Sequence, residues 1–148
     1  MVMSKARSRA RRLAMQGLYE WQMSENAPMD ILNSYKQRTD LGNVDMEYFQ
    51  LLLLGVPGHL QAIDQALTPH LSRPLKEIDP IELAILRLAA YELQQRLDIP
   101  YRVVINEAIE LAKTFGAEAG HKFVNGILDK LATTIRASEV RSRGKQKD

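Results

Sequence analysis

The sequence has 148 residues and contains no cysteine, one tryptophan and few aromatic residues. Without cysteine the chain has no disulfide, no thiolate metal site and no cysteine nucleophile. Uninterrupted apolar runs are short, as in Leu51–Leu54, whereas a membrane-spanning helix needs roughly 20 apolar residues. Arginines lie near the N-terminus, where a secretion signal has a hydrophobic stretch. We therefore expect a cytoplasmic protein that makes no membrane contact.

The sequence also lacks the motifs that carry common catalytic chemistry. It has no phosphate-binding loop, no dinucleotide-binding glycine pattern, no nucleophile elbow and no HExxH zinc motif. Glu107 and Glu110 share a helix face at a spacing of three, but such carboxylate pairs usually form a solvated face. The sequence therefore predicts no catalytic residue, no metal ligand and no cofactor, which indicates a protein that is not an enzyme.

Charge is distributed unevenly along the chain. The net charge is only +2, but residues 1–12 alone carry +5 and residues 136–148 carry +3. The residues between these two ends must therefore carry −6. An acidic body with basic ends favours a polyanionic partner, although terminal Lys and Arg residues also simply confer solubility. Charge alone leaves both interpretations open.

Apolar residues recur at helical spacing almost throughout, and no run alternates as a strand does. The pattern predicts an all-α domain of about seven helices over residues 1–137. The expected helices cover about 4–23, 28–37, 45–68, 80–96, 103–115 and 118–135, with a kink or a junction of two helices near Pro57 in the third. Residues 138–148 lack apolar spacing, so we expect a basic, disordered tail.

The first helix carries a polar face opposite its apolar stripe. Residues on this face follow spacings of three and four, which places them within about an 80° arc. They are Lys5, Arg9, Arg12, Gln16, Tyr19 and Met23. Arg7 and Arg11 flank the buried edge, and we expect both guanidinium groups to extend outward. Such a face suits RNA phosphates and bases, while the alternative is a solvated helix face.

A second candidate lies at the beginning of the last predicted helix, in the segment GHKFVNG. Phe123 projects about 40° outside the apolar stripe at 100° per residue, next to Lys122. One interpretation is a stacking platform for an unpaired base beside a cation. The other is an aromatic residue at the edge of the core.

Three segments together resemble the NusB family of bacterial transcription antitermination factors. They are ARSRARRLAMQGLYEWQ, LRLAAYEL and PYRVVINEAIELAKTFGAEAGHKFVNGILDKL, and the resemblance covers about residues 5 to 135. It implies an all-helical fold of two packed bundles. It also implies binding of boxA RNA together with NusE, a small-subunit ribosomal protein, and action with RNA polymerase in reading through terminators, notably in ribosomal RNA operons.

The resemblance implies roles for particular residues. The arginine-rich start falls on Arg7, Arg9 and Arg11, and the HKFVNG segment places Lys122 and Phe123, all assigned to RNA. Tyr19 and Glu82 are our choices for the NusE contact, because an acidic residue on the capped helix suits a basic partner. Glu82 has the alternative of completing only its own capping box.

The sequence departs from the family pattern at three places. Ser8 interrupts the basic run, Ala119 stands where an acidic residue is expected, and the Pro57-Gly58 pair interrupts a long helix. Two other hypotheses stay open. NusB-like modules also resemble the N-terminal part of some RNA cytosine methyltransferases, although this chain lacks the catalytic cysteines. The second open hypothesis is that two copies of the chain associate into a homodimer.

Overall fold

The computed structural model describes residues 4–147, with side chains described as far as residue 142. Residues 1–3 of the predicted domain and Asp148 of the predicted tail lie outside this part. The described chain is helical without strands, which confirms the all-α prediction. The α-helices are α1 (Lys5–Met23), α2 (Pro28–Lys36), α3 (Met46–Gly58), α4 (Leu60–Leu67), α5 (Pro80–Gln95), α6 (Tyr101–Phe115), α7 (Gly120–Ile135) and α8 (Ala137–Lys147). Two short 3₁₀ helices, Thr68–His70 and Leu75–Glu77, connect α4 to α5.

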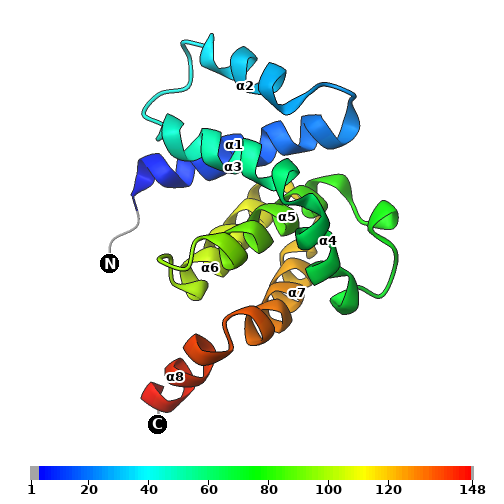
Figure 1. Ribbon diagram of the computed structural model, residues 1–148, viewed down its shortest axis with the longest axis vertical. Coiled ribbons are helices and arrows are strands. Elements are labelled where there is room, and N and C mark those ends of the chain that lie inside the picture. The colour runs from blue at the N-terminus through cyan, green and yellow to red at the C-terminus, as the bar shows by residue number, and fades with distance from the viewer. Residues whose placement is uncertain (1–3, 148) are drawn as a thin grey trace.

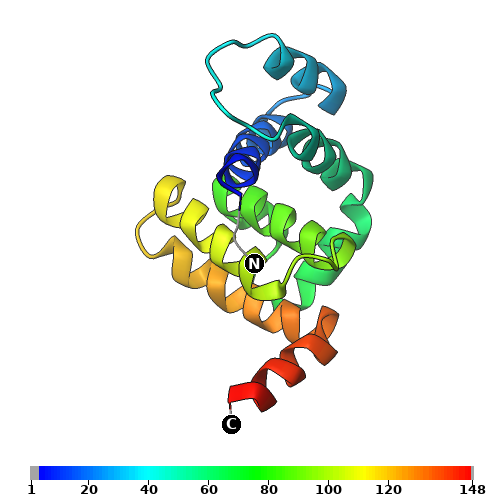
Figure 2. The same cartoon turned by 90° about the vertical axis from the view of Figure 1, so that its left-hand side faces the viewer.

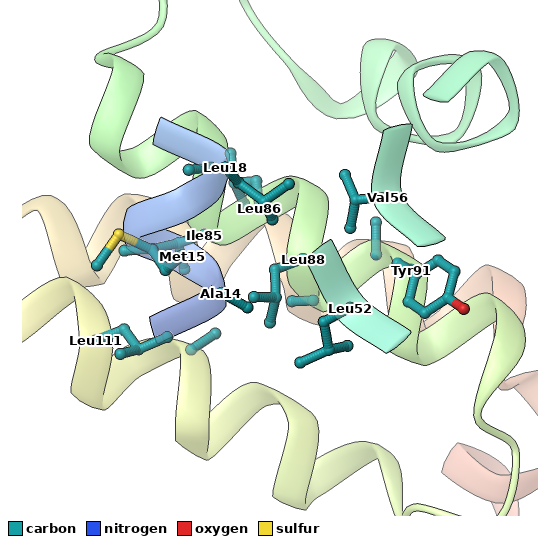
Figure 3. Close-up of a cluster of buried hydrophobic side chains, with 14 of the residues drawn as sticks. Ala14, Met15, Leu18, Leu52, Val56, Ile85, Leu86, Leu88, Tyr91 and Leu111 are labelled. Atoms are coloured by element: carbon teal, nitrogen blue, oxygen red, sulfur yellow. The ribbon is translucent and has the colours of Figure 1, made fainter. Parts of the chain in front are cut away.

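The helices form two packed groups with α5 between them. Helices α1, α2 and α3 lie together on one side, and α4, α6 and α7 pack on other faces of α5 (Figures 1 and 2). Helix α5 is buried over most of its length because it contacts α1, α3, α4, α6 and α7. Figure 3 shows the core at this junction, where Ala14 of α1, Leu52 of α3 and Leu88 of α5 lie close together. The position of α1 is therefore set by its contacts with α3 and α5.

Helix α1 begins where the sequence predicts. The Ser4 hydroxyl accepts a hydrogen bond from the backbone N–H of Arg7, which caps the first turn. Small residues line the buried side of the helix, including Ala10, Ala14 and Gly17. A Cβ on Gly17 would lie 2.9 Å from the Leu53 side chain, so glycine permits the close approach of α3.

The third predicted helix is divided into two, as its proline and glycines indicate. Helix α3 ends at Gly58 and α4 begins at Leu60, with His59 between them and Pro57 inside the last turn of α3. The His59 N–H still donates to the Gly55 carbonyl at 3.0 Å, so the chain turns without losing every helical bond. Helix α4 thereby packs against α5, where Asp64 pairs with Arg87.

Helix α5 begins at Pro80, where the sequence predicts a helix to begin. The Asp79 carboxylate accepts hydrogen bonds from the backbone N–H groups of Ile81 and Glu82, and Pro80 occupies the first turn. The Gln22 side chain of α1 donates to the Pro80 carbonyl at 2.8 Å. The C-terminal end of α1 is therefore joined to the beginning of α5.

The region beyond residue 137 differs from the sequence prediction. The structure continues as helix α8 where the composition indicates a disordered tail. Arg136 is buried between α7 and α8 and pairs with Glu139, which also accepts a hydrogen bond from the Tyr101 N–H at 2.9 Å. The first turn of α8 is thus held against the start of α6, a long-range contact that local composition does not reveal.

Candidate nucleic-acid interface

The polar face of α1 points away from the core, as the spacing predicts. Lys5, Arg9, Arg12 and Tyr19 are exposed and Gln16 is half-buried. The outward face also carries Met23, which is 59% exposed. Because these residues occupy successive turns of one rigid helix, the cations form a line suited to a polyanionic chain.

The middle of this face continues onto the end of α6. The Arg12 guanidinium lies over the Phe115 ring, with Cζ 5.7 Å from the ring centroid. Phe115 is half-buried and is the last residue of α6. Phe115 carries no distinctive signal in the sequence, because its spacing fits the predicted helix and its partner lies on α1. Arg12 and Phe115 together present a cation and an aromatic ring at one place.

Lys122 and Phe123 lie just beyond the turn that follows Phe115. Lys122 is exposed and Phe123 is half-buried, in the first turn of α7. Ala119, which precedes this helix, has a φ of 69°, a left-handed conformation that L-residues other than Asn and Asp seldom adopt. Lys122 and Phe123 place a second cation and a second aromatic ring close in sequence to Phe115.

Arg7 and Arg9 lie toward the other side of α1, near α3. The half-buried Arg7 guanidinium stacks over the Tyr48 ring at 4.3 Å. Arg9 Nη1 donates to the carbonyl of Asn43, in the connection between α2 and α3, at 3.1 Å. Both cations keep access to solvent, so the basic face of α1 extends from α6 on one side to α3 on the other.

Arg11 is a different case, and the prediction that its guanidinium extends outward is wrong. Its side chain is 1% exposed and forms a 2.9 Å ion pair with the fully buried Glu92 of α5. Arg11 Nη1 also lies 3.2 Å from Glu107 Oε1 on α6, and the Tyr48 hydroxyl donates to Glu92. Burial, followed by the neighbouring Glu92 charge, raises the pKa of Tyr48, which keeps its hydroxyl protonated as a donor. In this arrangement Arg11 offers RNA no accessible group.

The two residues chosen for a protein partner also differ in exposure. Tyr19 is 38% exposed, whereas Glu82 is 6% exposed and packs against Gly120 at the start of α7. A Cβ on Gly120 would lie 2.4 Å from Glu82 Oε2, so glycine makes room for the carboxylate. Burial, with a contribution from Asp79, raises the pKa of Glu82. Glu82 is therefore much less accessible than Tyr19 in this structure.

A groove lies near the C-terminal end of α1, next to Tyr19 in sequence. It has a volume of about 570 Å³ and mixes apolar walls with a few polar groups. Its lining includes Trp21, Gln22, Met23, Leu60, Leu75, Ile78, Leu83 and Arg87. Arg87 Nε and Nη2 donate to the two carboxylate oxygens of Asp64, each at 3.0 Å. Arg87 Nη1 donates to the side-chain oxygen of Gln22. Apolar surface beside ordered polar groups is typical of protein-binding sites.

In the part of the chain that the structure describes, no group of three or more His, Asp or Glu residues is placed to hold a metal ion. No helix in that part is long and apolar enough to cross a membrane. The fold and the exposed residues of α1, α6 and α7 define a class: an all-α protein with a basic, aromatic-bearing surface and a separate apolar groove.

The comparisons with known proteins assign this class to one family. The model of the NusB family matches residues 8–133. The transcription antitermination protein NusB of Idiomarina loihiensis is 56% identical over 131 residues, covering 88% of this chain and 94% of the relative. The NusB of Nitrosococcus oceani is 54% identical over 141 residues, covering 95% of each chain. The chain belongs to the NusB family of transcription antitermination proteins.

Solved structures agree with this membership. The structure of T. maritima NusB superposes with a TM-score of 0.76 at 32% identity, covering 88% of this chain and 93% of that one. A crystal structure of the antitermination factors NusB and NusE in complex with double-stranded RNA superposes with a TM-score of 0.73 at 26% identity, covering 89% and 99%. The resemblance of the sequence to this family is thereby confirmed, together with the family fold.

Proposed function

We propose that this chain is a cytoplasmic, non-enzymatic adaptor that binds boxA RNA together with NusE and acts on RNA polymerase during transcription antitermination. The observation that carries the proposal is the exposed basic face of α1, together with the Arg12–Phe115 contact and with the exposed Lys122 and half-buried Phe123 at the start of α7. The relative solved with NusE and RNA supports both partners.

The residues of this surface have separate roles in the proposal. Lys5, Arg7, Arg9, Arg12 and Lys122 neutralise phosphates, because their charged ends reach solvent. Gln16 contributes hydrogen bonds to base edges, and Phe123 stacks on an unpaired base. Phe115 joins this set on the strength of its contact with Arg12. Arg11 is not among the contacts.

The NusE contact is proposed for Tyr19 and the groove beside it. Tyr19 and Met23 are exposed at the same end of α1, and aromatic and methionine side chains are enriched in protein interfaces. In this proposal Glu82 supports the surface indirectly, because its contact with Gly120 holds the beginnings of α5 and α7 together. With 6% exposure, Glu82 offers a basic partner far less surface than Tyr19 does.

The test is a gel-shift with a boxA RNA, a scrambled RNA and NusE in all combinations. We expect weak binding of boxA by the chain alone, and much tighter binding when NusE is present. Equal affinity for the two RNAs, with and without NusE, would contradict the proposal. Light scattering of the same mixtures shows whether a homodimer forms and whether RNA or NusE replaces it.

A further inference from the structure

The most unusual side chain in the arginine-rich segment is the one that RNA cannot reach. Arg11 Nε lies 3.0 Å from both carboxylate oxygens of Glu92, and both side chains are buried almost completely. The Arg11 guanidinium also donates to Glu107 of α6. The Tyr48 hydroxyl of α3 donates to the Glu92 carboxylate. One cation of α1 therefore connects three other helices, α3, α5 and α6.

This ion pair is an inefficient means of gaining stability. Taking both charges out of water costs several kcal/mol per ion by general estimate, and an apolar pair of similar volume often does as well or better. The best attested advantage of a buried polar pair is that it selects one arrangement of the packed helices. A role in fixing geometry therefore accounts for the pair better than a role in stability alone.

The other buried residues of α1 are apolar. Its buried side carries the small residues Ala10, Ala14 and Gly17 together with the larger Leu13, Met15 and Leu18. Apolar burial is non-directional in itself. A bidentate guanidinium–carboxylate contact has a required direction. It therefore specifies how α1 is rotated on α5.

The rotation of α1 decides where the exposed cations point. Arg12 follows Arg11 by one residue, which is about 100° around the helix, and Arg9 precedes it by two. With Arg11 directed inward, Arg12 reaches the Phe115 ring and Arg9 reaches the Asn43 carbonyl. A rotation of about one residue would carry Arg12 away from Phe115.

We propose that Arg11 and Glu92 are positioning residues for RNA binding: their buried ion pair fixes the rotation of α1 and so aims Arg9 and Arg12. The inference rests on the proposed function, since it assigns these two cations to RNA. It also makes a distinctive prediction about Glu92, because this residue is fully buried and cannot touch RNA. Removal of its negative charge must weaken RNA binding, although it makes the chain more positive.

The test compares Glu92→Gln with Glu110→Gln, which removes the same charge from an exposed carboxylate of α6. Affinity for boxA RNA with NusE is measured together with hydrogen–deuterium exchange across α1. We expect Glu92→Gln to weaken binding about tenfold, within the range of indirect coupling effects, and to speed exchange in α1. Glu110→Gln should bind at least as tightly as the original chain and leave α1 exchange unchanged.

A second variant covers the case in which Glu92→Gln fails to fold, since it leaves Arg11 buried without its carboxylate. Arg11→Met with Glu92→Gln removes both charges and keeps an acceptor for the Tyr48 hydroxyl. A folded variant of either kind that binds RNA as well as the original chain, with unchanged α1 exchange, would overturn the inference. Failure of the original chain itself to bind boxA would overturn the proposed function instead, and exchange in α1 would still test the positioning role.

Discussion

Arg136 and Glu139 form a 2.6 Å ion pair across the junction of α7 and α8. The same guanidinium donates to the carbonyls of Leu93, Arg96 and Ile99 at 2.9 to 3.0 Å, and so caps the end of α5. Last-turn carbonyls of a helix have no partner within the helix, and burial makes an unsatisfied carbonyl costly. One buried arginine thereby joins α5, the start of α6 and the start of α8.

Replacement of this arginine should destabilise the whole fold. Arg136→Met keeps the apolar part of the side chain but leaves several carbonyls without a donor, so we expect a loss of about 3 kcal/mol of unfolding free energy. Urea denaturation followed by circular dichroism measures the change. The control is Arg141→Met, because Arg141 is exposed on α8 and should cost less than about 0.5 kcal/mol. Equal losses of unfolding free energy in the two variants would show that Arg136 does not stabilise the fold more than an exposed arginine does.

The features that sequence analysis predicted correctly depend on nearby residues. The beginnings of the first helix and of the helix at residue 80, and the break near Pro57, each depend on groups within a few residues, so local rules suffice. Arg11 was misplaced because its partner Glu92 is 81 residues away, and helical spacing put it only at the edge of the buried stripe. Nothing local distinguishes an arginine that extends outward from one that meets a buried carboxylate.

The outward cations of α1 should contribute separate phosphate contacts. Arg12→Ala is expected to weaken binding of boxA RNA and to reduce the salt dependence, with a slope of log K against log salt lower by about 0.7 for one lost contact to a single strand. Titrations at several salt concentrations measure this slope. Lys130→Ala is the matched control, because Lys130 is an exposed cation further along α7. An unchanged slope for Arg12→Ala would exclude Arg12 from the phosphate contacts.

Phe123 should contribute through its ring face and not through charge. Phe123→Leu preserves an apolar side chain at the core edge but removes the aromatic face, so binding should weaken by about 1 to 3 kcal/mol per stacked base. The slope against salt should stay the same, because no cation is lost. Phe123→Tyr keeps the ring and serves as the control. If Leu and Tyr at this position bind RNA alike, the ring does not stack on a base.

The buried carboxyl of Glu82 should make stability depend on pH. Because its pKa is raised in the folded state, the protonated form favours folding, and this contribution is lost as pH rises through the folded pKa. We expect Glu82→Gln to be more stable than the original chain at pH 7, with the difference shrinking toward pH 4. Thermal unfolding at both pH values measures it, with Glu77→Gln, an exposed acid, as control. A difference that grows on acidification would contradict the burial argument.

The left-handed residue before α7 stores strain at the edge of the proposed RNA surface. A left-handed conformation costs an L-residue roughly 1 to 2 kcal/mol, while glycine adopts it freely but loses more chain entropy on folding. With φ at 69°, Ala119→Gly should therefore stabilise the protein by about 0.5 kcal/mol. Ala117 lies in the same turn without a positive φ, so Ala117→Gly should destabilise the protein by a similar amount. Urea denaturation measures the stability of both variants. A loss of stability in both would show that Ala119 carries no backbone strain that glycine can relieve.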